Sequence, residues 1–146
     1  MRDPEMRDTT DLDDLFTAAK AAQARAHVPY SRFPVGAAIR DEAGRIHAGA
    51  NVENAAYPQG SCAEAAAITR MVVEGGSRIA EILVIGPGDM LCTPCGGCRQ
   101  RIREFARPDT PIHVAGPDGV RRSFTLDELL PHSFGPDNLD SAGATP

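Results

Sequence analysis

The sequence predicts an α/β fold in which a mixed sheet of five strands packs between layers of helices. The apolar, β-branched run at 79–85 is typical of a strand that is buried on both faces. Two pairs of short β-type segments, each joined by turn residues, predict two hairpins. Segments of helical composition separate these strands, and alternation of this kind favours helices packed on a sheet. At 146 residues the chain has the size of one domain.

The first helix is expected from Thr10 to about Ala26, because apolar residues recur there at helical spacing. Thr10 can cap this helix, and acidic residues follow in its first turn. The first hairpin is expected at 35–40 and 45–52, around a turn at 41–44.

The second half of the chain predicts two more helices, a buried strand, a second hairpin and a short final helix. Gly75 and Gly76 end the helix that begins near Cys62, and Thr125 with Glu128 forms a capping pattern for the last helix. The expected elements lie at 62–73, 79–85, 95–105, 111–115, 120–124 and 125–130.

The two ends of the chain are expected to be flexible and to flank a single folded domain. Residues 1–9 are mostly charged, and residues 135–146 are rich in Pro, Gly, Ser and Ala. The predicted domain therefore covers residues 10–134.

Charge and hydropathy narrow the classes of partner. A net charge of −5 argues against a nucleic-acid surface, which is normally basic. The chain has no apolar run of membrane-spanning length and no apolar signal segment after Met1. We expect a cytoplasmic enzyme that acts on small molecules, with neither a nucleic acid nor a membrane as partner.

The most informative motif combines Cys62-Ala63-Glu64 with Pro94-Cys95-Gly96-Gly97-Cys98. Three thiolates can hold one zinc ion and leave its fourth position open, which is the mark of a catalytic site. A carboxylate beside a water on zinc can carry protons. Two helix starts that point at one spot would favour the thiolate forms.

The cysteines alone leave other interpretations open. Cys92 could be the fourth ligand of a structural zinc site, or could join Cys95 and Cys98 in an iron–sulfur cluster. Cys95 and Cys98 could instead be a redox dithiol. Glu64 has an alternative role as well, in a capping box with Ser61.

Taken together, several motifs resemble the small, homotetrameric cytidine deaminases over about residues 12–134. These motifs are Tyr30-Ser31-x-Phe33-Pro34-Val35-Gly36-Ala37-Ala38, Asn51-Val52-Glu53-Asn54-Ala55, the two cysteine motifs with Arg99-Gln100, and Leu129-Leu130-Pro131. The resemblance implies a three-layer α/β/α fold and one zinc ion per subunit. It also implies hydrolysis of cytidine or deoxycytidine to the uracil nucleoside and ammonia, a step of pyrimidine salvage.

The resemblance also implies a role for each matching residue. Cys62, Cys95 and Cys98 would bind zinc, and Glu64 would shuttle protons while zinc-bound hydroxide attacks C4 of the pyrimidine. Asn51 and Glu53 would hydrogen-bond the ribose 3′-hydroxyl. The other implied contacts are Phe33 in the base pocket, the backbones of Ala63 and Thr93 on the pyrimidine, and Tyr57 and Phe134 at sites shared between subunits of a homotetramer.

One position departs from the family pattern. Many relatives with three thiolate ligands carry Arg directly after the Glu, where this chain has Ala65. Three thiolates on Zn²⁺ leave a net charge of −1, so we expect helix N-termini and Arg99, or another arginine, to offset it. Cys92 is expected to be a small apolar filler.

Two other functions remain open from the sequence. One is a deaminase of a nucleoside antibiotic of the blasticidin kind, which the Asn51-Val52-Glu53 segment disfavours because that segment suits an unmodified ribose. The other is a zinc- or cluster-stabilised interaction module without enzymatic activity.

Overall fold

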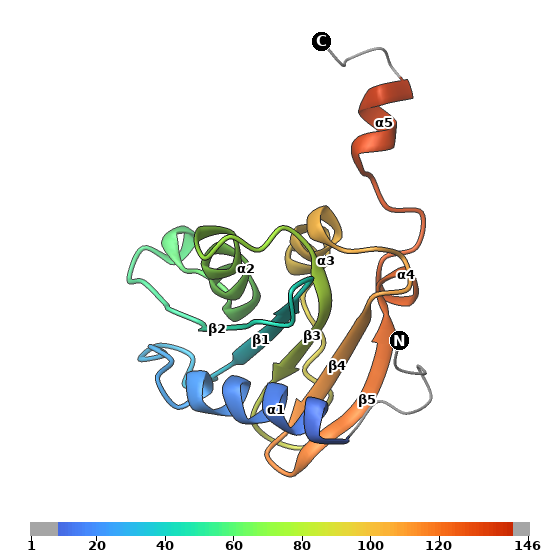
Figure 1. Ribbon diagram of the computed structural model, residues 1–146. Coiled ribbons are helices and arrows are strands. Elements are labelled where there is room, and N and C mark those ends of the chain that lie inside the picture. Colours follow the sequence, from blue (N-terminus) through green and yellow to red (C-terminus); the bar gives the residue numbers. More distant parts are fainter. Residues whose placement is uncertain (1–8, 142–146) are drawn as a thin grey trace.

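The computed structural model describes residues 9–141 (Figure 1). Most of the predicted flexible N-terminus, residues 1–8, and residues 142–146 of the predicted tail lie outside this range. The elements in chain order are α1 (Thr9–Gln23), β1 (Gly36–Asp41), β2 (Ile46–Ala50), η2 (Tyr57–Gln59), α2 (Ala63–Val73), β3 (Ile79–Ile85), α3 (Gly96–Phe105), β4 (Pro111–Gly116), β5 (Gly119–Thr125), α4 (Leu126–Leu129) and α5 (Pro136–Ser141).

The five strands form one mixed sheet in the order β2-β1-β3-β4-β5. The β3–β4 pair is parallel and the other three pairs are antiparallel. Helix α1 covers one face of the sheet, and α2 and α3 lie on the other (Figure 1). The predicted α/β fold, with a five-stranded mixed sheet between helical layers, is confirmed.

Alternating side chains of the central strands fill two separate cores. In β3, Ile82 and Val84 pack on the side of α2 and α3, whereas Leu83 and Ile85 pack on the side of α1. Burial on both faces explains the apolar run Ile82–Ile85 at the end of this strand, whose bounds match the prediction.

Two glycines allow α1 and α2 to lie close to the first hairpin. A Cβ on Gly36 of β1 would collide with the backbone oxygen of Ala19 in α1. A Cβ on Gly49 of β2 would lie 2.5 Å from the backbone nitrogen of Ala67 in α2. No side chain fits at either position, so the two helices are held at short distance on opposite faces of the hairpin.

A buried histidine ties the hairpin to the end of α2. The His47 ring lies between Asp41 and Glu74, with Nε2 2.7 Å from Asp41 Oδ2 and Nδ1 2.8 Å from Glu74 Oε2. Glu74 is the C-cap of α2, and its other carboxylate oxygen accepts a hydrogen bond from Arg70. This cluster fixes the C-terminal end of α2, while the cysteine motif lies at its N-terminal end.

The structure differs from the sequence prediction at several boundaries. Helix α1 ends at Gln23 because the N–H groups of Arg25 and Ala26 bond three residues back, in tighter turns, after which His27 bridges to Val52. The same bridge explains why β2 ends at Ala50 and not at residue 52, since Val52 pairs with both His27 and Ser61.

The C-terminal segment contains an element that the sequence analysis did not predict. Residues Pro136–Ser141 form the short helix α5, which projects from the body of the domain (Figure 1). The Asn138 side chain accepts a hydrogen bond from the Gly135 N–H, which stabilises the start of this turn. The capping box of Thr125 and Glu128 at α4 is confirmed.

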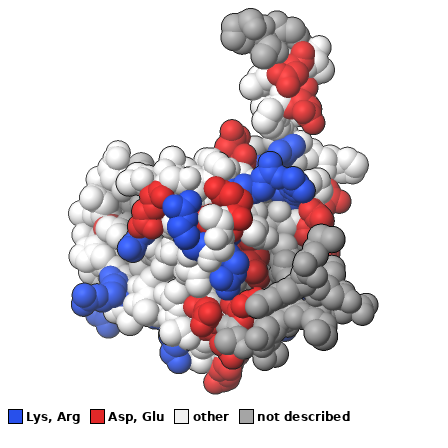
Figure 2. All heavy atoms as spheres, viewed as in Figure 1, with Lys and Arg blue, Asp and Glu red and all other residues white. Residues whose placement is uncertain are grey.

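The surface in Figure 2 carries acidic and basic side chains interspersed, without a continuous basic patch on the face shown. Within residues 9–141, no helix is both long enough and apolar enough to span a membrane.

Candidate active site

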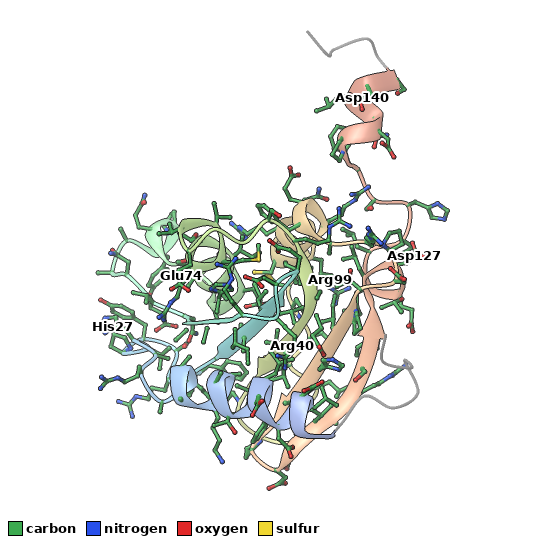
Figure 3. All side chains as sticks on the ribbon, in the orientation of Figure 1. His27, Arg40, Glu74, Arg99, Asp127 and Asp140 are labelled. Carbon is green, nitrogen blue, oxygen red and sulfur yellow. The ribbon has the colours of Figure 1, made fainter. Side chains whose placement is uncertain are left out.

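Three cysteines from two helix starts converge at one point. The sulfur atoms of Cys62, Cys95 and Cys98 all lie within 4.8 Å of one another. Cys62 is the N-cap of α2, Cys95 is the N-cap of α3, and Cys98 is in the first turn of α3. All three sulfurs therefore face one point and are available as ligands. Sulfur atoms gather between α2 and α3 in Figure 3.

The three thiols differ in their tendency to ionise. Hydrogen bonds from the Cys98 backbone N–H, and from that of Gly97, lower the pKa of Cys95 below its ordinary value, despite opposing burial. Burial raises the pKa of Cys62 and of Cys98, and the nearby Glu64 carboxylate raises both further. The helix start therefore favours the thiolate at Cys95 alone, contrary to our expectation for all three. A bound cation must supply the remaining stabilisation.

The sulfurs of Cys62, Cys95 and Cys98, called the sulfur group below, are spaced to bind a zinc ion. Zinc–sulfur bonds of about 2.3 Å place the sulfurs of a tetrahedral site roughly 3.8 Å apart, within the observed limit. Cys92 lines the same cavity but is not a member of the sulfur group. The structure thus brings together the three predicted ligands and leaves out the cysteine that the four-sulfur and iron–sulfur interpretations need.

Glu64 is buried in the first turn of α2 and lines the same cavity, which has a volume of about 180 Å³. Burial raises its pKa, while its own backbone N–H, the Cys98 thiol and the Arg101 guanidinium oppose that shift. The alternative capping box is wrong, because Cys62 and not Ser61 is the N-cap. A raised pKa makes a buried carboxyl group better suited to take up and release a proton than a carboxyl group at its ordinary pKa.

Asn51 lines the cavity that contains Cys62, Glu64 and Cys95, called the metal cavity below. Its side chain also bonds to the backbone of residues 33–35. Its Oδ1 accepts a hydrogen bond from Val35 N at 2.9 Å, and its Nδ2 donates to Phe33 O at 2.9 Å. An amide has two N–H groups and two lone pairs on oxygen. One N–H is therefore left over by these two bonds.

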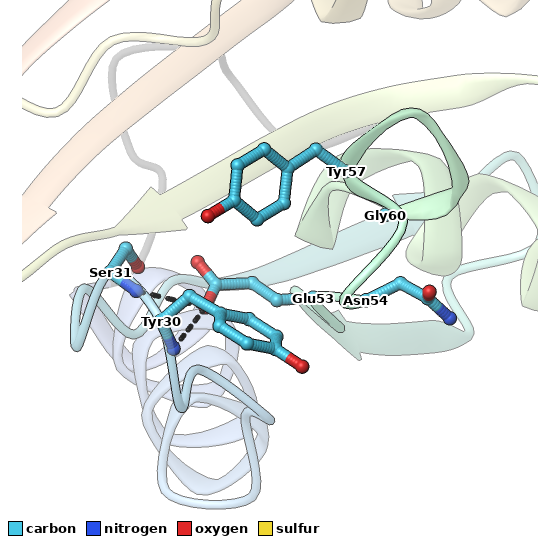
Figure 4. Close-up of a pocket in the computed structure, with 6 residues that line it drawn as sticks. All are labelled: Tyr30, Ser31, Glu53, Asn54, Tyr57 and Gly60. Carbon is cyan, nitrogen blue, oxygen red and sulfur yellow. Dashed lines mark hydrogen bonds between the residues drawn. The ribbon is translucent and has the colours of Figure 1, made fainter.

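Glu53 lies at a second and larger cavity of about 380 Å³ (Figure 4). Its Oε1 accepts hydrogen bonds from the backbone N–H groups of Tyr30 and Ser31, each at 3.1 Å. Hydrogen bonds from Ser31, through side chain and backbone, lower the pKa of Glu53. The cavity is lined by Tyr30, Ser31, Glu53, Asn54, Tyr57 and Gly60.

The other predicted contact residues divide into two groups. Ala63 and Thr93 line the metal cavity. The Phe33 and Phe134 side chains line neither cavity and are 46% and 58% exposed, while Tyr57 is 75% exposed. Tyr57 meets only Tyr30, edge to face at 6.0 Å, among the ring contacts of the described residues.

Two arginines of α3 support the site in different ways. Arg99 donates to Pro94 O at 2.7 Å, Leu129 O at 2.8 Å and Thr93 Oγ1, and so fixes the loop before α3. Arg101 places Nη1 3.9 Å from Cys98 Sγ. The arginine beside the Cys98 sulfur is therefore Arg101 and not the predicted Arg99. Its position three residues after Cys98 on one helix is the signal that could have identified it.

Comparisons with known proteins agree with this geometry. Residues 9–114 match the model of the cytidine and deoxycytidylate deaminase zinc-binding region. A cytidine deaminase of Sporosarcina psychrophila is 37% identical over 132 residues, which cover 90% of this chain and 97% of the relative. One of Mycobacterium tuberculosis (strain H37Rv) is 39% identical over 121 residues, which cover 83% of this chain and 87% of the relative.

The fold is also similar to solved structures. The crystal structure of cytidine deaminase from Burkholderia pseudomallei matches with a TM-score of 0.79 and 37% identity, over 84% of this chain and 98% of that one. The structure from Mycobacterium leprae matches with a TM-score of 0.69 and 39% identity, over 82% and 97% of the two chains. The chain belongs to the cytidine and deoxycytidylate deaminase family.

Proposed function

We propose that this protein is a zinc-dependent deaminase that hydrolyses cytidine and deoxycytidine to uridine and deoxyuridine and releases ammonia, as a step of pyrimidine salvage. The observation that carries the proposal is the buried Glu64 beside a group of three sulfurs with no fourth cysteine. Such a site combines a metal with an open position and a group that can move protons.

Cys62, Cys95 and Cys98 would hold the zinc ion, which would lower the pKa of a bound water toward about 7. Glu64 would accept a proton from the attacking water and pass it to N3 of the pyrimidine. The same carboxyl group later protonates the departing 4-amino group, so that ammonia leaves as oxygen takes its place on C4. The raised pKa of Glu64 suits both directions of transfer.

The size of the two cavities supports a sugar site at Glu53. Ligand pockets usually measure about 300–1,000 Å³, so the metal cavity of about 180 Å³ is small for a whole nucleoside. We assign the pyrimidine to the metal cavity, against the backbones of Ala63 and Thr93. The sugar would extend past Asn51 toward the cavity of about 380 Å³ at Glu53. Asn51 would offer its remaining N–H to the 3′-hydroxyl, and Glu53 would accept from it.

The test is to measure metal content and turnover on the same purified sample. We expect one zinc per chain and loss of cytidine absorbance as uridine forms, with deoxycytidine also turned over. The control is the same sample stripped of metal by a chelator, which should be inactive and regain activity with added zinc. Iron with acid-labile sulfide, or a zinc-loaded protein that is inactive on both nucleosides, would refute the proposal.

We also propose that the protein works as a homotetramer with shared active sites, in the cytoplasm. Phe134 and Tyr57 are exposed and line no metal cavity within their own chain, as expected for side chains that complete a neighbour's site. Gln100 in α3 donates to Phe134 O at 3.0 Å and so fixes where this side chain leaves the domain. Native mass measurement tests the assembly, and cell fractionation tests the location.

Replacing Phe134 with Ala is expected to lower kcat/KM for cytidine by roughly 5- to 150-fold, because stacking of a base on an aromatic ring contributes about 1–3 kcal/mol. The measurement is steady-state kinetics on the zinc-loaded variant. Val73→Ala removes another side chain, 80% exposed at the end of α2, and should leave kcat/KM unchanged. A monomer with full activity at high dilution would contradict the shared site.

A further inference from the structure

The guanidinium of Arg101 lies beside the sulfur of Cys98. Its Nη1 is 3.9 Å from Cys98 Sγ, within the range of a hydrogen bond to sulfur. Arg101 and Cys98 are one turn apart on α3, and long helical side chains point back toward the N-terminus, which brings the guanidinium over the sulfur.

The residue next to Cys98 leaves room for this arrangement. A Cβ on Gly97 would lie 3.2 Å from Arg101 Nη1, closer than ordinary van der Waals contact. With glycine at this position the guanidinium can approach the start of α3 without crowding. Gly97 and Arg101 therefore act as a pair, one supplying the space and the other the charge.

The site needs positive charge beyond the metal. Three thiolates and Zn²⁺ sum to −1, and the Glu64 carboxylate adds another negative charge in the same cavity. Ala65 follows Glu64 on α2 and supplies no charge. The neighbouring arginines of α3 point elsewhere, since Arg99 bonds to the loop before the helix and Arg103 donates to Ser133 Oγ.

We propose that Arg101 is the residue that compensates the thiolate charge of the zinc site, by hydrogen bonding to the sulfur of Cys98. It is a positioning residue and touches no substrate atom. The hydrogen bond draws electron density from the thiolate, so the metal is held by a less negative ligand set and remains a stronger Lewis acid. This inference concerns the same site as the proposed function and rests on zinc being its metal.

The experiment compares zinc-loaded wild type with Arg101→Gln and measures the rate at which a chromogenic chelator takes up the zinc. Loss of a group that supports metal ligands typically costs about 10- to 100-fold in metal affinity or activity, so zinc release should be faster by up to that factor. The acidic limb of the pH profile of kcat should also move to higher pH, because a weaker Lewis acid lowers the pKa of its water less.

Three further variants make the result specific. Arg101→Lys keeps a cation and should restore part of the slow release. Ala65→Arg in the Arg101→Gln background places a guanidinium on α2 and should slow release again. Arg107→Gln removes an exposed arginine just beyond α3 and should match wild type. Release rates and pH profiles of Arg101→Gln equal to those of wild type would overturn the inference. Faster zinc release in a protein that turns over no cytidine would sustain it while refuting the proposed function.

Discussion

Replacing Glu64 with Gln is expected to leave zinc in the protein and to lower the turnover of cytidine by at least about 100-fold, the low end for general acid–base catalysis. Gln has nearly the same shape as Glu and fits the buried position, but its amide cannot take up and return a proton. The sulfur group does not involve this side chain, so metal content should stay the same. Zinc analysis and the absorbance assay on one sample measure both effects.

A matched variant separates loss of the proton carrier from loss of charge. Glu104 is an exposed glutamate on α3, so Glu104→Gln changes net charge equally and should keep wild-type turnover and zinc. Full activity in the Glu64→Gln protein would refute the proposed proton transfer. Loss of zinc in that variant would show instead that the carboxylate is itself a ligand.

Replacing Cys98 with Ser is expected to remove zinc and to reduce turnover to background. Cys98 is fully buried, and its sulfur completes the group of three, so the variant leaves two thiols for the metal. A hydroxyl is a poor substitute, because zinc sites in proteins are built from thiolate, imidazole and carboxylate ligands. Metal content after dialysis against a weak chelator gives the result.

Cys92→Ser is the control for this prediction, since it makes the same chemical change in the same cavity at a sulfur outside the group. It should retain both zinc and activity. Loss of zinc from Cys92→Ser would support the four-sulfur site and a purely structural metal. Retention of zinc by Cys98→Ser would mean that the ligand set is misassigned.

The parts of the fold and site that the sequence predicts well depend on local signals. The run Ile79–Ile85 is apolar apart from Glu81, because most of β3 is buried on both faces, and its bounds follow directly. Cys62 and Cys95 each precede a helical segment, so their position at helix starts could be predicted from a few neighbouring residues. The β-branched residues and turn signals likewise identify both hairpins.

The remaining features depend on which distant segments meet. The two hydrogen bonds of Asn51 involve residues 33–35, which only the folded chain brings near. The division of the site into two cavities follows from the path of 53–60 around Tyr30, which no local pattern specifies. Burial reverses the expected ionisation of Cys62 and Cys98, because the desolvation of a thiolate depends on the whole packed environment and not on the helix start alone.

The ligands come from segments before and after β3 in the chain, since Cys62 precedes this strand and Cys95 and Cys98 follow it. When zinc is bound, the three cysteines also cross-link the chain. The cross-link closes the loop between Cys62 and Cys95, which contains β3. Such a closure restricts the unfolded chain, and metal that binds only the folded form adds its binding free energy to folding. The ion that serves chemistry in this protein therefore also joins α2 to α3, and stripping it should loosen the contact between those two helices.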